Sequence, residues 1–188
     1  MKRIVVMALS ILLCLSALCA CSDGESIQYH VELAMEQLGR PTAEAYRNMG
    51  LLGDPEDAIW SGSLTGKYGA DLLGMRMDVS IGHSGGTFTS GKLTEMRTDY
   101  VRYSSIVDGD HALRLYEALC GAYGEAEPVS DARPFSEATA DLLENAEWED
   151  RYANLWRTGG NEVELHVLGD SGKNRVVLDI KTPVDRLG

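Results

Sequence analysis

Two stretches of this chain alternate apolar and polar residues, and this alternation restricts the fold more than any other feature. In residues 75–81 the odd positions are Met, Met, Val and Ile, and the even positions are Arg, Asp and Ser. Residues 162–168 repeat the pattern with Val, Leu and Val at the odd positions. Side chains of a strand point alternately to two faces, so each stretch predicts a half-buried strand. We therefore expect an α+β fold, an antiparallel sheet with helices packed on one face.

Other signals place the remaining elements. Thr42, and either Asp108 or Asp110, are expected to cap helices whose apolar residues recur every three or four positions. Gly159-Gly160 is expected to form a hairpin turn. We predict helices over 25–39, 42–49, about 108–124 and 136–147, and strands over 75–81, 92–106, 152–157, 162–168 and 175–181.

The two parts of the chain resemble each other. An offset of 85 aligns apolar positions of the predicted helices, and an offset of 88 aligns residues 75–79 with 163–167. We interpret this as a degenerate duplication of a helices-then-strands unit, with halves 25–107 and 108–188 in one domain. Coincidence between two amphipathic helices, each beside a strand pair, is the alternative. In architecture alone the arrangement is similar to tandem-repeat β-lactamase inhibitor proteins and small envelope lipoproteins, although no motif of either is present.

The amino terminus reads as an export signal. Lys2 and Arg3 precede a largely apolar run that extends to Leu18 and is too short for a comfortable membrane span. The run ends in the tetrapeptide Leu-Cys-Ala-Cys, residues 18–21. The alternative is that this apolar run is not cleaved from the protein and remains as a membrane-anchor helix.

This tetrapeptide resembles the lipobox of bacterial lipoproteins. The resemblance implies that the signal peptide, residues 1–20, is removed and that Cys21 receives a diacylglycerol and often a further acyl chain such as palmitate. Residues 21–24 would then be a lipidated tether, because two or more acyl chains anchor a protein stably. Cys19 departs from the usual pattern, in which Ala, Ser or Thr stands at that place. The implied location is the outer face of the plasma membrane or, in a two-membrane envelope, the outer membrane.

Charge and cysteine content limit the partners and the means of stabilisation. The chain carries a formal charge of −12, which becomes −14 once the two basic residues of the leader are removed. An acidic exported domain repels nucleic acid, so we expect no nucleic-acid partner. With Cys21 lipidated, Cys120 has no partner for a disulfide, and we expect it to be an inert thiol in the core.

Residues 82–92, GHSGGTFTSGK, match two enzyme motifs. Ser84 stands where the nucleophile of a G-x-S-x-G elbow would be, and Gly86 to Lys92 has the spacing of a P-loop. The elbow needs a buried strand before it and a helix after it, and neither is predicted here. The P-loop needs Ser or Thr where Leu93 stands. We interpret the stretch as a glycine-rich hairpin loop.

Histidines and acids form three candidate combinations for chemistry. Asp108 could complete a triad with Ser84 through either His111 or His166. Asp108 and His111 lie at the start of a predicted helix, however, and capping of that helix explains them better. Glu162, Glu164 and His166 share one face of a predicted strand at a spacing that could suit a metal. We expect this face to be a solvated polar surface instead.

These observations predict a membrane-anchored extracytoplasmic lipoprotein that acts as a non-catalytic binding or interaction module. We expect no cofactor, no metal and no catalytic residue, and a protein or other envelope component as partner. The binding surface is expected to be the open sheet face bearing Arg76, Asp78, Glu164 and His166. Two alternatives remain, a Ser84-dependent hydrolase and a small-ligand carrier that uses the concave side of the sheet.

Overall fold

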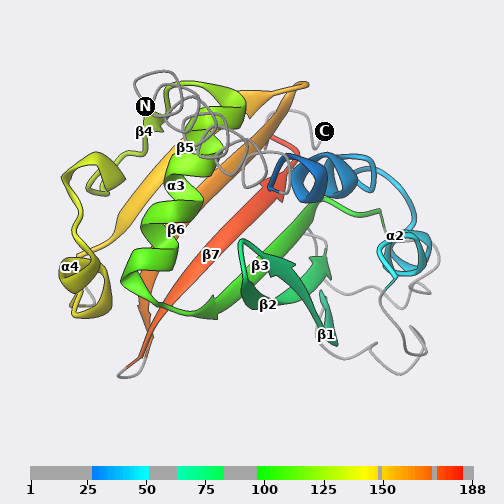
Figure 1. Ribbon diagram of the computed structural model, residues 1–188. Helices are drawn as coiled ribbons and strands as arrows, with labels where there is room; N and C mark the ends of the chain where they lie inside the picture. The colour runs from blue at the N-terminus through cyan, green and yellow to red at the C-terminus, as the bar shows by residue number, and fades with distance from the viewer. Residues whose placement is uncertain (1–26, 51–62, 83–96, 148–149, 171–172, 184–188) are drawn as a thin grey trace, which may run out of the picture.

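The computed structural model describes residues 27–50, 63–82, 97–147, 150–170 and 173–183. They form one antiparallel sheet of seven strands in the order β1-β2-β3-β7-β6-β5-β4, as Figure 1 shows. The strands are β1 Ser63–Leu72, β2 Met75–Gly82, β3 Tyr100–Ile106, β4 Glu127–Pro128, β5 Tyr152–Thr158, β6 Asn161–Asp170 and β7 Lys173–Lys181. The helices are residues 27–35, α2 Thr42–Asn48, α3 Gly109–Tyr123 and α4 Ala140–Glu144, with a 3-10 turn at Phe135–Glu137.

The helix over residues 27–35 and α3 lie on the same face of the sheet, in front of it in Figure 1. The Tyr103 hydroxyl on β3 donates a hydrogen bond to the carbonyl of His30 at 3.2 Å. The Trp156 indole N–H on β5 donates to the carbonyl of Gly124, just after α3, at 3.1 Å. The short helix α2 packs against strand β2. The prediction of an α+β fold with helices on one face is thus confirmed.

The buried core lies between these helices and the sheet, where the predicted alternation holds. Met77, Val79 and Ile81 on β2 are buried, whereas Arg76 and Asp78 between them are exposed. The three apolar residues that alternate along β6 are fully buried, and cross-strand neighbours on β7 and β3 continue the same layer. These core residues are Val163, Leu165, Val167, Val176, Leu178, Ile180, Val101 and Tyr103.

Two hairpins have turns of the same kind. Leu73 and Gly74, with φ of 55° and 82°, connect β1 to β2. Gly159 and Gly160, with φ of 59° and 79°, connect β5 to β6, as predicted. Two successive residues with positive φ make the tight turn that matches the twist of an antiparallel pair.

The strand order has the symmetry that the predicted duplication requires. Strands β1, β2 and β3 run from one edge toward the middle, and β5, β6 and β7 run from the other side toward the same place. Each set of three follows two helices, and each has its tight turn between its first two strands. The antiparallel pair β3·β7 is the seam between the sets. The order agrees with a repeat, and a common origin of the two halves stays a prediction.

Some local predictions need correction. Thr42 is the first residue of α2 and not its cap, because the capping position is Pro41. Strand β1 was not predicted, since its glycines and short polar residues hide any alternation. The helix expected over 136–147 is limited to a 3-10 turn and the five residues of α4. Of the strand expected over 92–106, β3 covers residues 100–106, and residues 83–96 lie outside the described part.

Candidate functional site

Some of the predicted site residues lie outside the described residues or serve the fold. Cys21 and Ser84 are outside the described residues. Asp108 caps α3, since its carboxylate accepts a hydrogen bond from the backbone N–H of His111 at 2.9 Å. The His111 ring is buried, with Nε2 2.7 Å from the Leu72 carbonyl, and burial lowers the pKa of His111. These contacts connect α3 to the end of β1, which is a structural role.

We call the sheet face opposite the helices the outer face, and its centre differs from the prediction. Glu164 and His166 were expected to be solvated, yet they are 6% and 5% exposed. Asp179, beside them on β7, is 5% exposed. The prediction of a wet face is therefore wrong at the middle of the sheet, although it holds for Arg76 and Asp78 near its edge.

The burial has its origin in a cluster of charged side chains that the strand register brings together. Arg102 on β3 is paired with Asp179 on β7, and Asp179 is paired with Glu164 on β6. Side chains at directly paired positions on one face lie close enough to bond. The charged cluster consists of Arg102, Arg151, Glu164, His166, Asp179 and Lys181.

Glu164 is held by three neighbours. Its Oε1 accepts a hydrogen bond from Arg151 Nη2 at 2.6 Å and lies 3.2 Å from His166 Nδ1. Its Oε2 accepts one from Lys181 Nζ at 2.5 Å. The hydrogen bond with His166, followed by that from Lys181, lowers the pKa of Glu164 to about 2, although burial acts in the opposite direction. A buried carboxylate with so many donors stays ionised across the physiological range.

Asp179 forms a two-point pair with Arg102. Nε and Nη2 of the guanidinium donate to Oδ1 and Oδ2 of the carboxylate at 2.6 and 2.7 Å. This pairing raises the pKa of Arg102. The guanidinium carbon also lies 5.6 Å from the centre of the Tyr100 ring. Paired hydrogen bonds and an aromatic contact fix a guanidinium in both position and orientation.

His166 lies between the two acids. Its Nδ1 faces Glu164, and its Nε2 is 3.9 Å from Asp179 Oδ2, which is too long for a hydrogen bond. Nε2 is buried and has no hydrogen-bond partner. The imidazole therefore fills the space between two carboxylates whose bonds are already made with the cations.

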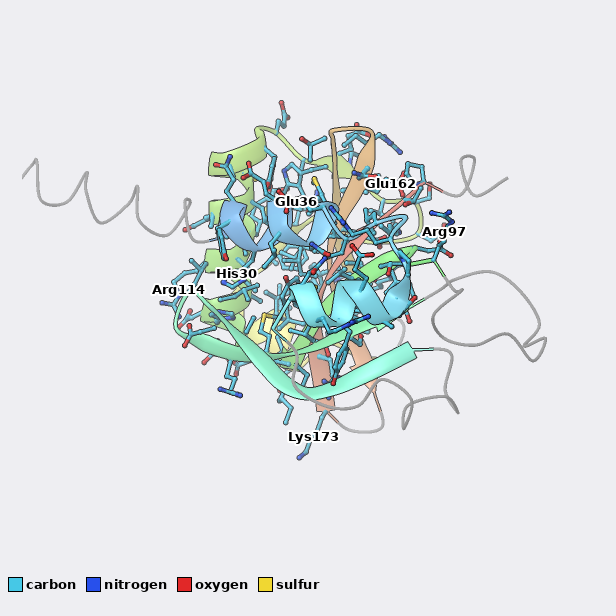
Figure 2. The ribbon with its side chains drawn as sticks, turned by 90° about the vertical axis from the view of Figure 1, so that its right-hand side faces the viewer. His30, Glu36, Arg97, Arg114, Glu162 and Lys173 are labelled. Atoms are coloured by element: carbon cyan, nitrogen blue, oxygen red, sulfur yellow. The ribbon has the colours of Figure 1, made fainter. Side chains whose placement is uncertain are left out.

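Exposure is unequal within the charged cluster. The side chains of Glu164 and Asp179 are 8% and 7% exposed. The side chains of Arg102, Arg151 and Lys181 are 44%, 36% and 32% exposed. Solvent therefore meets cationic side chains, and the acids that hold them lie beneath. Figure 2 shows Glu162, from the same face, on the opposite side of the view from His30 and Arg114 of the helix layer.

The rest of the described residues contain weaker candidates for a functional site. Among the described residues, no group of three or more His, Cys, Asp or Glu side chains is placed so that it could hold a metal ion, and this includes Glu162, Glu164 and His166. No described helix has the length and apolar character needed to cross a bilayer. Cys120 is a free, partly buried thiol that packs against the core, and its inertness stays a prediction. A groove on α2 is lined by Pro41, Ala43, Glu44, Arg47 and Asn48.

Comparison with known proteins adds no assignment, since no family model, no curated protein and no solved structure matches the chain. The similarity in architecture to tandem-repeat β-lactamase inhibitor proteins thus stays a prediction from the sequence. The charged cluster was missed by sequence reasoning because its members come from four segments that only the strand register unites. A signal was present in part, since Glu164 and His166 had been placed on one face.

The depressed pKa of Glu164 predicts how stability depends on pH. A carboxyl with a lowered pKa in the folded state adds stability above its ordinary value of 4.5, and that stability is lost as the pH falls toward about 2. At pH 7, Glu164→Gln should lower the free energy of unfolding by an amount on the order of 2 kcal/mol. The difference from wild type should shrink between pH 4.5 and pH 2, in urea melts at a series of pH values.

Glu117→Gln is the matched control, because Glu117 is an exposed carboxylate on α3. Its effect should be small throughout. A loss in Glu164→Gln that is the same at every pH would contradict an ionised, hydrogen-bonded Glu164.

Proposed function

We propose that the protein is a lipid-anchored extracytoplasmic lipoprotein whose domain is a non-catalytic binding module. The outer face of the sheet is the binding surface. The observation that carries this proposal is the charged cluster, in which buried acids hold half-exposed cations on the sheet face opposite the helix over 27–35 and α3 (Figure 1). Rigid, pre-positioned polar groups reduce the entropy that a surface loses when a partner binds.

The anchoring part of the proposal rests on the sequence. Residues 18–21 resemble the lipobox, and the acylated Cys21 would hold the domain at a membrane surface on the outer side. The described chain enters the core at Ile27, shortly after Cys21, and the helix that begins there lies on the face of the sheet opposite the outer face (Figure 1). A protein or other component of the envelope is the proposed partner.

The non-catalytic part is supported by the surroundings of residue 84. Strand β2 ends at Gly82, pairs antiparallel with both neighbours and is buried on one face only. A nucleophile elbow follows a strand that is buried within a parallel region of a sheet. His111 and His166 belong to opposite sides of the sheet, so they do not combine into one relay.

Lipidation at Cys21 can be tested by metabolic labelling. Cells expressing the wild-type chain and fed an alkyne analogue of palmitate should give a labelled protein in the membrane fraction. Cys21→Ala should be unlabelled and should keep its leader. Cys19→Ala is the matched control and should be labelled like wild type, because Ala suits that place in a lipobox. Equal labelling of wild type and Cys21→Ala would contradict the proposal.

Use of the outer face can be tested by photocrosslinking in native membranes. A benzophenone amino acid placed at Ile106 or Leu168 would lie on the outer face, where these side chains are 52% and 36% exposed. The same group at Glu117 would lie on the exposed side of α3. We expect one discrete crosslinked product, shared by the two outer-face positions and absent at Glu117. Crosslinking from Glu117 alone, or from none of the three, would contradict this use of the face.

A further inference from the structure

We propose that the outer face binds an acidic, carboxylate-bearing segment of a partner protein through the half-exposed cations of the charged cluster. This inference rests on the proposed function and specifies the chemistry of the partner. The recognition elements are the guanidinium groups of Arg102, Arg151 and Arg157 and the ammonium group of Lys181.

The centre of the outer face is opposite in sign to the whole chain. Along the four central strands β3, β7, β6 and β5, with Arg151 before β5 and the hairpin end Asp170 and Lys173 left aside, five basic side chains accompany three acidic ones. The basic residues are Arg102, Arg151, Arg157, Arg175 and Lys181, and the acidic ones are Glu162, Glu164 and Asp179, whereas Asp71, Asp78 and Glu127 lie with Arg76 on the outer strands β1, β2 and β4. The chain as a whole carries −12, so its negative charge is concentrated elsewhere. A local positive area on an acidic protein favours a partner with a matching negative area.

The depth of the charges increases this contrast. Glu164 and Asp179 are buried, and the side chain of Glu162 is 17% exposed. Arg157, which pairs with Glu127 and Glu162, is 55% exposed. Over β7 and β6, at the centre of the outer face, an approaching molecule therefore meets donors before it meets acceptors, whereas the exposed acids Asp78 and Glu127 lie on β2 and β4. Arginine and lysine have donors only, so the complementary group must be an acceptor, and a carboxylate suits the guanidinium fork best.

Arg102 is the best ordered of these donors. Its Nε and Nη2 bond to Asp179, and its charge lies near the Tyr100 ring. Nη1 takes no part in that pair, which leaves N–H donors for a second carboxylate. Because the guanidinium is already fixed, binding costs little further side-chain entropy.

An apolar contact accompanies the cations at one end of the face. Ile106 on β3 and Leu168 on β6 are both paired with Arg175 on β7, so the two exposed apolar residues stand on either side of Arg175. The Arg175 guanidinium reaches over β3, where it donates to the Ser104 hydroxyl at 3.1 Å. Ile106 and Leu168 are among the few large hydrophobic residues of the described chain that are exposed. Apolar anchors beside charged groups are typical of protein interfaces. They favour a peptide segment over a phosphate polymer.

Long polyanions match the charge distribution of the outer face less well than a short acidic protein segment does. A nucleic acid or an anionic bilayer extends well beyond the outer face and meets the rest of a chain whose formal charge is −12, where repulsion opposes binding. A short acidic segment of a protein can remain on the positive area. The four central strands offer it a continuous surface.

The test uses the purified full-length lipoprotein in neutral detergent and a fluorescein-labelled hexaglutamate peptide. At low salt we expect a saturable rise in anisotropy that weakens as salt is added, because exposed charges are screened. Arg157→Gln removes an exposed cation without leaving a buried acid unpaired, and it should weaken binding about threefold. The paired change Arg102→Met with Asp179→Leu removes a fixed donor together with its buried acid. It should weaken binding about tenfold while the circular dichroism melt stays cooperative.

Arg114→Gln is the matched control, since it makes the same change in net charge on the exposed side of α3, away from the outer face in Figure 2. Its affinity should equal that of wild type. An equal loss in Arg114→Gln and Arg157→Gln would mean that only net charge matters and would overturn the proposal. Binding of tripolyphosphate or of phosphatidylglycerol vesicles as tight as that of the peptide would overturn it as well. So would the absence of saturable peptide binding.

This inference and the proposed function can fail separately. Crosslinks from Ile106 and Leu168 in native membranes, together with no hexaglutamate binding, would overturn the acidic partner and leave the binding face standing. Peptide binding that ignores Arg157→Gln and the paired change would also overturn the inference alone. The absence of outer-face crosslinks would remove the proposed function on which the inference rests.

Discussion

The pairing of β3 with β7 is the constraint on which both layers of the molecule depend. On the helix side it places Tyr103 beside Leu178 and thereby joins the apolar layers of the two strand sets into one core. On the outer side the same register places Arg102 opposite Asp179, and β6 adds Glu164. A shift of one residue in this pairing would exchange the faces of a whole strand and bury the guanidinium in the core. Core and charged cluster are therefore two consequences of one register.

The energetics of the two faces differ. The apolar layer stabilises the fold in the ordinary way, and no described cysteine is available to assist it, since Cys120 is a free thiol. Removing charges from water is costly, and a buried ion pair is often no more stabilising than apolar residues of the same size. Glu164 and Asp179 thus add less to stability than their short hydrogen bonds suggest. What they supply is position, because they hold the cations of the outer face in fixed places.

The elements that alternation or helical spacing marks were predictable, and those that depend on contacts across the sheet were not. Strands β5, β6 and β7, the half-buried β2 and the capped helix α3 appear near their predicted places. The sequence does not predict strand β1, because Gly66 and Gly69 interrupt its pattern. The strand forms through its pairing with β2. The alternation predicts the polar face of β6 but not its burial. That burial depends on Arg151 and Lys181, whose approach follows from strand pairing that the local pattern of β6 does not contain.

The claim that buried acids hold the exposed cations is tested most directly by a double-mutant cycle on Arg102 and Asp179, measured by chemical unfolding at neutral pH. Arg102→Met leaves a buried carboxylate unpaired and should cost on the order of 3 kcal/mol. Asp179→Leu alone completes the cycle. The double variant should lose about 1–3 kcal/mol less than the sum of the two single variants, and this difference is the coupling energy. Additive effects, with Arg102→Met close to wild type, would mean that Asp179 does not hold the guanidinium and would contradict the account.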